Sequence, residues 1–367
     1  MMSTQRLKFA MVGCGRVSGN HLAALTSGNI PSQLVAVADL DAARAADKGA
    51  KYGVPHYTDY RKMMRRHPEV DVVNVATPTG YHATHVMDLA RFGKHIVVEK
   101  PMALSVRDCD RMIAACQAHG ARLFVVKQNR FNPAVVAARR ALEAGRFGKL
   151  VMGTARVRWR RDQKYYGDGW HGTWELDGGV MSQQASHHLD VLQWFMGPVE
   201  SAQCLSATRL LNIEVEDSAV AILRFTSGAL GAFEATVATR PQDLEGSLSI
   251  LGEGGSVVIG GPALNHIVTW QFEEKRPEDA EIAGSGQQDI PNVYGRGHGP
   301  YLGDVIAAII EGRPGLVEAP EGRKVVAILT ALYESAARGG RQVQPGCQPR
   351  RSRLGKRPAR RADEAIG

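Results

Sequence analysis

Four short apolar runs, separated by segments with helical spacing, lie within about the first hundred residues and constrain the fold more than any other feature. They are Leu7–Val12, Leu34–Ala38, Val70–Ala76 and Ile96–Val98. Each run ends abruptly at glycine, proline or polar residues, as strands of a parallel sheet covered on both faces do. Strands that alternate with helices in this way predict an α/β domain with the Rossmann layout.

A glycine turn follows the first of these strands. The run enters Gly13-Cys14-Gly15-Arg16-Val17-Ser18 and then a segment with helical spacing. Gly13 permits a tight turn, and Gly15 lets the backbone approach a pyrophosphate at the helix N-terminus. Ser18 stands where a third glycine is usual, and a small residue there still allows close helix–strand packing. The turn therefore predicts a dinucleotide site.

The second strand ends at Asp39, 24 residues after Gly15. An acid at this point accepts hydrogen bonds from ribose hydroxyls and repels a 2′-phosphate, so we expect NAD rather than NADP. Asp41 is the weaker candidate because it lies beyond the strand end. Asp39 could also cap the following helix, and the two roles can coexist.

The other two strand ends carry candidate site residues. Thr77-Pro78 and then His82 follow one strand, and Glu99-Lys100-Pro101 follows the next. Ligands of open α/β sheets bind outside the carboxyl ends of the strands. Burial can lower the pKa of such a lysine until it moves protons. The alternatives are a salt-bridged strand end for Lys100 and a surface or capping role for His82.

The periodicity changes after the first domain. Alternating segments predict strands at residues 150–159, 218–225, 229–235 and 247–251, and Thr226-Ser227-Gly228 predicts a hairpin. We expect an α+β domain with a large open antiparallel sheet that has one packed face. The predicted division is residues 1–127, then 128–344 with C-terminal helices packing back on the first domain, then 345–367 as a basic, disordered tail.

A helix with a polar stripe is predicted after Gly179. Gln183, His187, Asp190 and Trp194 share that stripe at helical spacing. His187 would then have Gln183 one turn before it and Asp190 one turn after it, an arrangement that orients a general base. His188 is the alternative, because a small error in helix phase exchanges the two residues.

Cations and aromatic residues are dense in the segment between residues 158 and 174. Arg158, Tyr165 and Tyr166 are its candidate substrate contacts, since arginine suits a carboxylate or phosphate and an aromatic ring suits a sugar or base. A surface loop with incidental charge is the alternative. The glycine-rich segment Asn292–Tyr301 is predicted to be a loop near the same site.

Composition excludes several classes of protein. No apolar run approaches the ~20 residues that cross a bilayer, so no membrane association is expected. The five cysteines lack CxxC spacing, which favours free thiols and a cytoplasmic location. Of the net charge of +8, the segment from Pro345 onward supplies +5, from seven basic and two acidic residues. The remaining +3 gives no reason to expect specific nucleic-acid binding, and no metal site is predicted.

Gly13-Cys14-Gly15-Arg16-Val17, Val75-Ala76-Thr77-Pro78 with His82, and Glu99-Lys100-Pro101 together resemble the Gfo/Idh/MocA family of NAD(P)-dependent sugar and inositol oxidoreductases. The resemblance implies that Lys100 is catalytic and hydrogen-bonds the reacting hydroxyl. It also implies an open sheet that forms the interface of a homodimer or homotetramer. The cofactor-binding residues that it implies are Gly13, Gly15, Arg16, Val17, Asp39, Thr77, Pro78, His82, Glu99, Lys100 and Gln128.

The family's Asp-x-x-x-His pattern falls on Gln183 and His187, so His187 matches the catalytic histidine. Gln183 replaces the usual aspartate and cannot hold an imidazolium by charge, which suggests that it binds substrate. The implied substrate-binding residues are Lys100, Asn129, Arg158, Tyr165, Tyr166, Gln183, His187 and His188.

The segment 158–174, combined with Gln183–Asp190, further resembles one subgroup, the UDP-N-acetylglucosamine-uronate 3-dehydrogenases of bacterial surface-polysaccharide (O-antigen, lipopolysaccharide) pathways. The resemblance implies NAD-dependent oxidation of the C3 hydroxyl of UDP-2-acetamido-2-deoxy-D-glucuronate. It leaves open whether 2-oxoglutarate recycles the NADH. The alternatives are another sugar or inositol dehydrogenase of the family, and a non-catalytic NAD-binding regulator.

Overall fold

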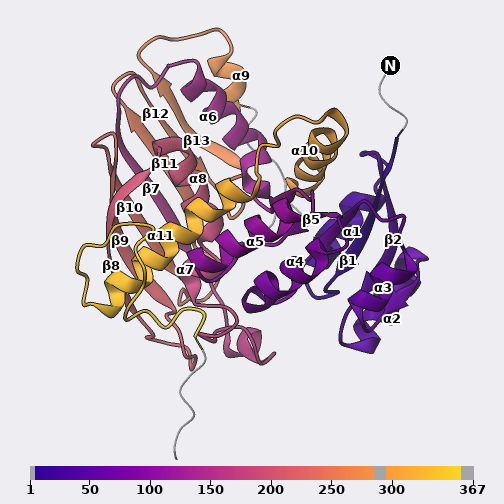
Figure 1. The fold of residues 1–367 in the computed structure, drawn as a ribbon. Helices are drawn as coiled ribbons and strands as arrows, with labels where there is room; N and C mark the ends of the chain where they lie inside the picture. Colours follow the sequence, from indigo (N-terminus) through magenta and orange to yellow (C-terminus); the bar gives the residue numbers. More distant parts are fainter. Residues whose placement is uncertain (1–4, 285–294, 357–367) are drawn as a thin grey trace, which may run out of the picture.

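A computed structural model describes residues 5–284 and 295–356 and shows two domains joined side by side (Figure 1). The first domain contains a six-stranded parallel sheet with strand order β3-β2-β1-β4-β5-β6. Its strands are β1 (Leu7–Val12), β2 (Ser32–Ala38), β3 (His56–Tyr57), β4 (Val72–Val75), β5 (His95–Val98) and β6 (Leu123–Val125). The predicted Rossmann layout is therefore confirmed.

Three helices of this domain begin where Asp41, Asp59 and Ser105 accept hydrogen bonds from backbone N–H groups. Asp41 accepts hydrogen bonds from the backbone N–H groups of Ala43 and Arg44 at the start of α2, so the alternative of Asp39 as the cap is wrong. Asp39 is thereby left at the strand end. The helices are α1 (Ser18–Thr26), α2 (Ala42–Tyr52), α3 (Tyr60–Arg66), the 3-10 turn η1 (Thr79–Tyr81), α4 (His82–Ala90) and α5 (Val106–Ala118).

The second domain is built on a seven-stranded sheet with strand order β13-β12-β11-β7-β10-β9-β8. The predicted hairpin joins β9 to β10 with Leu230 opposite Arg224. The sheet is mixed rather than wholly antiparallel, because β7 and β10 pair in parallel. Its strands are β7 (Leu150–Arg158), β8 (Val199–Ala207), β9 (Ser218–Phe225), β10 (Leu230–Thr236), β11 (Glu245–Gly252), β12 (Gly255–Gly260) and β13 (His266–Phe272).

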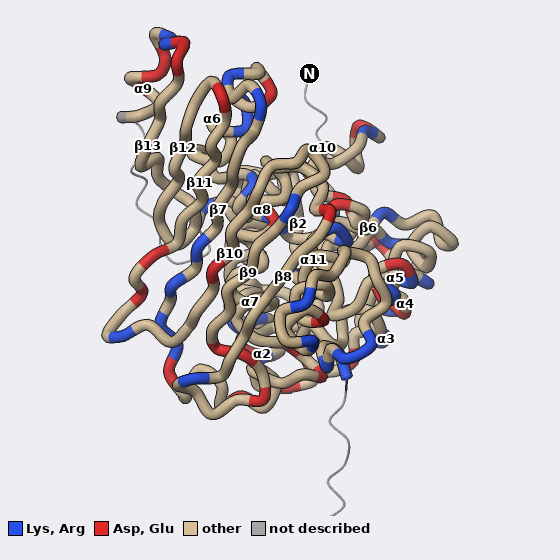
Figure 2. The backbone as a smooth tube through the Cα atoms, turned by 90° about the vertical axis from the view of Figure 1, so that its left-hand side faces the viewer, with Lys and Arg blue, Asp and Glu red and all other residues tan. Residues whose placement is uncertain are grey.

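Within residues 5–284 and 295–356, the helices α8 and α11 pack against one face of this sheet. Helix α8 contacts β7 and β11, and α11 contacts β8. The other face is open and is turned toward the viewer in Figure 2. The helical elements of the domain are η2 (Gln128–Phe131), α6 (Pro133–Glu143), η3 (Gln163–Tyr166), α7 (Val180–Gln183), α8 (Ser186–Met196), α9 (Asp279–Gly284), α10 (His298–Glu311) and α11 (Ala319–Ala337).

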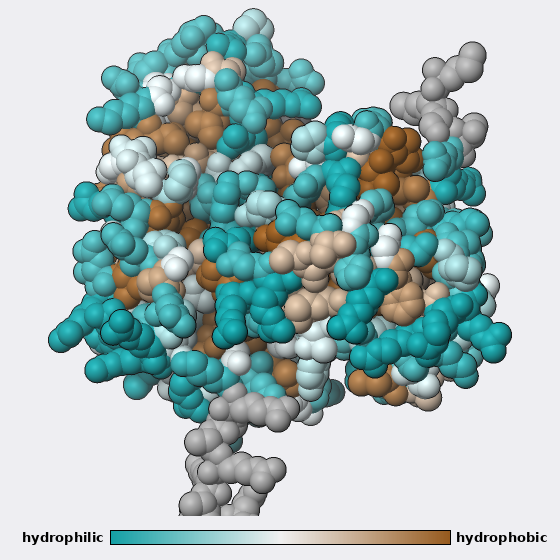
Figure 3. All heavy atoms as spheres, in the orientation of Figure 1, coloured by the Kyte–Doolittle hydropathy of each residue, from teal (hydrophilic) through white to brown (hydrophobic). Residues whose placement is uncertain are grey.

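The two C-terminal helices together contribute to the apolar cores of both domains. Tyr301 and Leu302 of α10 belong to the apolar core of the first domain. Helix α11 contributes Val326 to that core and Leu332 to the core of the second domain. On the face seen in Figure 3, hydrophilic side chains cover most of the surface and apolar residues show between them.

The segment after α11 differs from the prediction of a disordered tail that begins at residue 345. Residues 345–356 pack against the second domain, because the Glu334 carboxylate accepts the backbone N–H groups of Arg350, Arg351 and Ser352 at 3.1, 2.8 and 2.9 Å. Leu354 is buried. The prediction of disorder rested on the low apolar content of this segment. Three hydrogen bonds from backbone N–H groups to one carboxylate stabilise its packed position in spite of that low content. The remaining basic residues of the tail lie outside the described residues, as do Asn292, Val293 and Tyr294 of the predicted loop.

None of the described helices is long and apolar enough to cross a membrane. All five cysteines are free thiols, and Cys14, Cys109, Cys116 and Cys204 are buried.

Candidate active site

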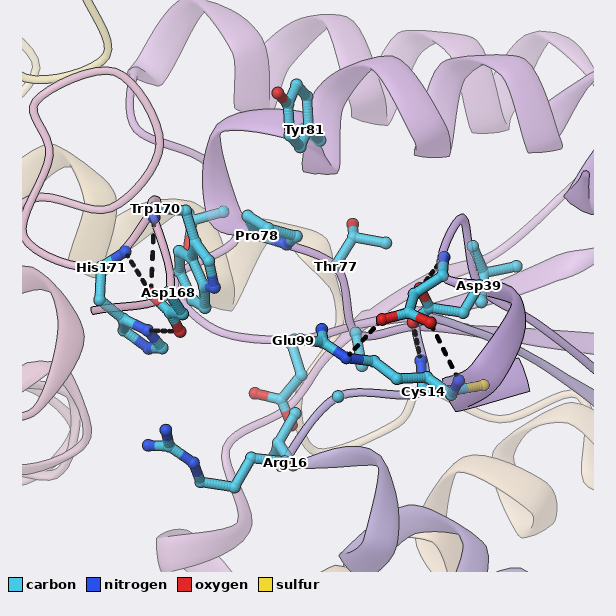
Figure 4. A pocket seen from close by; sticks show the side chains of 18 of the residues that line it. Cys14, Arg16, Asp39, Thr77, Pro78, Tyr81, Glu99, Asp168, Trp170 and His171 are labelled. Carbon is cyan, nitrogen blue, oxygen red and sulfur yellow. Dashed lines mark hydrogen bonds and ion pairs between the residues drawn. The ribbon is translucent and has the colours of Figure 1, made fainter. Parts of the chain in front are cut away.

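A cavity of about 1120 Å³ lies where the carboxyl ends of the first sheet meet the second domain (Figure 4). In that view Asp39 and Cys14 occupy one side, Asp168, Trp170 and His171 the other, and Thr77 and Pro78 lie between them. Of the predicted site residues, the cavity is lined by Gly13, Gly15, Arg16, Val17, Asp39, Thr77, Pro78, Glu99, Lys100, Tyr165, Gln183 and His187.

The glycine turn has the shape that a dinucleotide requires. Gly13 has φ +95°, and a Cβ there would lie 2.5 Å from the carbonyl oxygen of Ala76, so no larger residue fits. A Cβ on Gly15 would meet no atom within 4 Å. The backbone of Gly15 therefore borders open space at the start of α1, where N–H groups favour an anion. This geometry fits the pyrophosphate of NAD.

The carboxylate of Asp39 is held in place by backbone donors. Oδ2 accepts the N–H of Cys14 at 2.6 Å, and Oδ1 accepts the N–H of Asp41 at 2.8 Å. Each carboxylate oxygen has a further lone pair that can accept a ribose hydroxyl. The turn thus fixes the Asp39 carboxylate on which the predicted preference for NAD over NADP rests.

The same end of the cavity contains residues that sequence analysis missed. Tyr60, Tyr81 and His85 line it, and His85 Nδ1 lies 2.9 Å from Thr77 Oγ1. Tyr81 and His85 are four residues apart near the start of α4, which is the spacing of one helix face. That spacing was the only available signal, and it is common in helices of every function.

Glu99 anchors the strand end rather than acting as an acid. Burial opposes its ionisation, but the hydrogen bond from His21 at 2.8 Å holds the pKa of Glu99 down at about 2. His298 Nε2 lies 4.0 Å away, and these three residues are the one group of possible metal ligands among the described residues. Asn74 Nδ2 donates to His21 Nδ1, so His21 Nε2 carries the proton that it gives to Glu99. The hydrogen bonds from Asn74 to His21 and from His21 to Glu99 account for the position of these side chains without a metal.

His82 is buried and does not line the cavity, contrary to the prediction that it contacts the cofactor. Its Nε2 lies 2.8 Å from the carbonyl oxygen of Thr77 and its Nδ1 lies 3.0 Å from that of Pro101. The ring therefore joins the two strand-end loops that carry Thr77 and Lys100. The prediction was wrong because a helical N-terminal position does not reveal which way a side chain turns.

Lys100 projects from the end of β5 toward the second domain and keeps part of its surface open to the cavity. Its Nζ donates to the backbone oxygen of Gln183 at 2.6 Å and to Gln183 Oε1 at 3.0 Å. Burial lowers the pKa of Lys100, while the carboxylates of Glu99 and Asp177 oppose that shift. Gln183, predicted to bind substrate, thus holds the lysine.

His187 lines the cavity from the first turn of α8. Burial lowers its pKa well below the ordinary value, and the charges of Lys100 and Lys127 add to this effect, so the ring is neutral near pH 7. Its Nε2 lies 3.2 Å from Gln128 Nε2, and Nδ1 has no partner among the described residues. If Oε1 of the Gln128 carboxamide faces Nε2 instead, Nδ1 keeps a lone pair that can accept a proton.

The predicted polar stripe is divided. The helix breaks between α7 and α8, so Gln183 and His187 lie on different helices. Asp190 instead accepts two hydrogen bonds of 2.8 Å from Arg130, and Lys127 Nζ lies 3.5 Å from it. The prediction that Asp190 orients His187 is therefore wrong, and Gln128 occupies that position.

Four predicted substrate contacts do not line the cavity. Arg158 points to the open face of the sheet, where it pairs with Glu234 at 2.6 Å and Glu245 at 3.0 Å. His188 is buried against Trp159, with ring centroids 5.7 Å apart. Asn129 and Tyr166 are buried in the domain interior. Alternation along β7 could have excluded Arg158, because Val157 and Trp159 must face the core.

The second domain supplies other residues in their place. They are Trp159, Arg161, Asp168, Trp170, His171 and Gln184. Asp168 Oδ2 lies 2.5 Å from His171 Nδ1, and burial lowers the pKa of His171 to about 4. Arg16 of the glycine turn lies 4.7 Å from the ring centroid of Tyr165, so the loop between β7 and α7 reaches the cofactor side.

Comparisons with known proteins agree with this geometry. The family described as "Oxidoreductase family, NAD-binding Rossmann fold" matches residues 7–127, and the "GFO/IDH/MocA C-terminal domain" matches residues 135–258. The WlbA dehydrogenase from Bordetella pertussis, solved with NADH and UDP-GlcNAcA, is 39% identical with a TM-score of 0.86, covering 95% of this chain and 100% of that chain.

Two further relatives are informative. The WlbA dehydrogenase from Chromobacterium violaceum, also solved with NADH and UDP-GlcNAcA, is 39% identical with a TM-score of 0.86, covering 94% and 97% of the two chains. The scyllo-inositol 2-dehydrogenase (NAD(+)) of Bacillus subtilis is 26% identical over 304 residues, covering 81% of this chain and 83% of that protein. The two family matches coincide with the two domains and span well over half of the sequence, so the chain belongs to the Gfo/Idh/MocA family of NAD-dependent oxidoreductases.

Proposed function

We propose that this protein oxidises the C3 hydroxyl of UDP-2-acetamido-2-deoxy-D-glucuronate to a ketone with NAD, as a step in bacterial surface-polysaccharide synthesis. The observation that carries the proposal is the 39% identity, over nearly the whole chain, to two dehydrogenases solved with UDP-GlcNAcA. The inositol dehydrogenase is more distant, at 26%. The cavity of about 1120 Å³ exceeds the ~300–1,000 Å³ typical of a site for one small ligand, so it has room for NAD and a second ligand together.

In this proposal, bound NAD supplies the hydride acceptor. The neutral imidazole of His187 takes the proton of the substrate hydroxyl. Lys100, fixed by two hydrogen bonds to Gln183, donates to the same oxygen and stabilises the negative charge that develops there. His187 and Lys100 come from different domains, so a hydroxyl reaches both only within the cavity.

Arg161 is a cation of the second domain that lines the cavity, and it suits the carboxylate or diphosphate of the substrate. Replacing Arg161 with methionine is expected to raise the KM for the UDP-sugar about tenfold, the loss of one hydrogen bond to a charged group. The KM for NAD should not change. Arg160→Met is the matched control, because Arg160 adjoins it in sequence but does not line the cavity. Equal KM values in the two variants would contradict this role.

The direct test is turnover of a substrate panel that contains UDP-GlcNAcA, UDP-GlcNAc, myo-inositol, scyllo-inositol and glucose. We expect NADH formation at 340 nm with UDP-GlcNAcA and a product lighter by two hydrogens in mass spectrometry. Parallel reactions with 2-oxoglutarate determine whether it recycles NADH, and they prevent tightly held NADH from being mistaken for inactivity. Oxidation of an inositol or glucose without turnover of any UDP-sugar would instead select the second candidate, which the inositol dehydrogenase relatives favour.

A purely regulatory NAD-binding protein is not supported, because such a protein needs neither Lys100 nor His187 at its ligand. It would predict salt-dependent DNA binding that is lost when residues 345–367 are deleted. The free thiols fit the cytoplasmic location expected of an enzyme that uses sugar nucleotides.

The open face of the second sheet supports a homo-oligomer. Leu205, Val220 and Ile222 are 65%, 63% and 58% exposed on this face, and neighbouring exposed apolar side chains are typical of protein–protein interfaces. Arg158 and Glu234 lie beside each other on the neighbouring strands β7 and β10, and basic and acidic positions alternate there in Figure 2. A second copy of this chain could cover both the exposed apolar residues and the charged pair on this face. Light scattering that gives the mass of one chain would contradict this proposal.

A further inference from the structure

The long loop between β7 and α7 carries much of the cavity wall that the second domain supplies. Residues 159–179 contain the 3-10 turn η3 and are otherwise irregular, and Asp168, Trp170 and His171 of this loop line the cavity. Loops of this length inside a domain usually have a function. Because ordering a loop during binding costs affinity, a loop that binds substrate has to be held in place beforehand. The contacts that hold it are therefore part of the site.

A chain of hydrogen bonds connects the cavity residue Trp170 with the end of the loop. The backbone oxygen of Trp170 accepts the hydroxyl of Thr173 at 2.7 Å, and the backbone oxygen of Thr173 accepts the N–H of Gly178 at 2.9 Å. The backbone oxygen of Leu176 accepts the N–H of Gly80, in the turn η1 of the first domain, at 2.9 Å. Residues 170–178 therefore form one connected segment that reaches both the cavity and the first domain.

The C-terminal residues 353–355 contact this segment directly. The N–H of Gly355 donates to the backbone oxygen of Trp174 at 2.8 Å, and the guanidinium carbon of Arg353 lies 5.3 Å from the centroid of the Trp174 ring. Leu354 belongs to the apolar core of the second domain, and a Cβ on Gly178 would lie 2.9 Å from its Cδ1. A backbone hydrogen bond, a cation–π contact and apolar packing thus join the C-terminal residues to the loop.

The C-terminal segment is also anchored outside the loop. The Glu334 carboxylate of α11 holds the backbone N–H groups of residues 350–352, as described above. On the other side, a Cβ on Gly355 would lie 3.1 Å from the Cβ of Leu104, which follows Lys100 by four residues. Gly355 has φ +72°, a conformation that favours glycine. Residues 350–356 therefore connect α11, the loop and the chain that follows the catalytic lysine.

We propose that residues 350–356 form a C-terminal strap that positions the loop of residues 159–179 for binding of the sugar substrate. Arg353, Leu354 and Gly355 are positioning residues, because they contact the loop and do not line the cavity. Without them, the sugar has to order the loop as it binds. The inference rests on the proposed dehydrogenase function, in which the second-domain side of the cavity binds the sugar.

The test compares two shortened chains. One lacks residues 352–367 and with them the contacts to the loop, whereas the matched control lacks only residues 357–367 and keeps the strap. In the first chain the KM for the sugar should rise about tenfold or more, because binding then has to order the loop. The change in kcat should be smaller, and the Kd for NAD should stay within about threefold, because Lys100, His187 and the glycine turn are unaltered. The control should match the wild-type enzyme.

Trypsin cleavage after Lys164 provides a measurement that does not depend on activity. Lys164 is exposed in the loop, and cleavage requires the loop to open locally. Mass spectrometry should therefore show faster cleavage at Lys164 in the chain that lacks residues 352–367 than in its control. Cleavage after Lys51, exposed on α2 of the first domain, should be equal in the two chains. Equal acceleration at both sites would reveal general destabilisation and would overturn the proposal.

If the chain without residues 352–367 does not fold, Leu354→Ala in the otherwise unaltered chain decides the question. Leu34→Ala is its control, because Leu34 is buried to a similar extent but lies in β2 and does not line the cavity. The Leu354 variant should raise the KM for the sugar several-fold, and the Leu34 variant should leave it unchanged. Equal KM values in these two variants would contradict the role of the strap, as would equal KM values and cleavage rates in the two shortened chains.

All KM values are measured with whichever substrate the wild-type enzyme oxidises. Failure with UDP-GlcNAcA would therefore count against the proposed substrate alone. If the wild-type enzyme oxidised no member of the panel, the proposed function would fail, whereas the trypsin comparison would still decide whether the strap holds the loop.

Discussion

Replacing Lys100 with methionine is expected to lower kcat by about 10²–10³-fold, because a fixed cation at the developing alkoxide is lost. Methionine has a similar length and no charge, so the packing at the end of β5 should survive. The affinity for NAD, measured by quenching of protein fluorescence, should stay within about threefold of wild type, because Gly13, Gly15 and Asp39 are unaltered.

Lys94→Met is the matched control for this variant. Lys94 belongs to the same domain, but its Nζ donates to the backbone oxygen of Pro68 away from the cavity. The control removes the same charge and should keep wild-type turnover. If the Lys100 variant also kept turnover within a few fold, the lysine would not be catalytic.

Replacing His187 with asparagine is expected to lower kcat by about 10²–10⁴-fold through loss of the general base. The pH profile provides a second measurement. Because burial and the charges of Lys100 and Lys127 lower the pKa of His187, the imidazole stays neutral as pH falls through the ordinary value of 6.5. The low-pH limb of the wild-type kcat profile should therefore lie well below pH 6.5, and it should be absent from the variant's residual activity.

His188→Asn distinguishes the two adjacent histidines. His188 packs against Trp159 and does not line the cavity. This variant should therefore lower the melting temperature and keep turnover within a few fold of wild type. A large loss of turnover in His188→Asn together with normal turnover in His187→Asn would reverse the assignment.

Much of the cofactor half of the site could be predicted because its residues are adjacent to strand ends. Parallel strands place their carboxyl ends along one edge of a sheet, so Gly15, Asp39, Thr77 and Lys100 had to meet once the strands were recognised. His82 also follows a strand end, but its ring turns inward and lies between the carbonyl oxygens of Thr77 and Pro101. The chemistry of a residue type does not specify such an orientation.

The substrate half was less predictable because it depends on loops and on packing between domains. Arg158 and Arg161 are both arginines in the same cation-rich segment. Arg158 lies on the open face of the sheet because of the alternation along β7, whereas Arg161 lies in the following loop and lines the cavity. The break between α7 and α8 likewise places Gln183 and His187 on different helices, while Arg130 engages Asp190 and Gln128 contacts the histidine. A single helix phase extended through Gly179 could not reveal that break.

The sequence by itself determined the two-domain α/β and α+β architecture and the NAD-binding turn, and its motifs predicted Lys100 and His187 as site residues, because local periodicity and short motifs encode strand ends and turns. Only the tertiary structure decided what surrounds those two residues. Gln183 holds the lysine, and Gln128 contacts the histidine. These contacts join residues about 60 to 80 positions apart in the chain, where packing and burial, rather than local sequence pattern, decide which side chains meet.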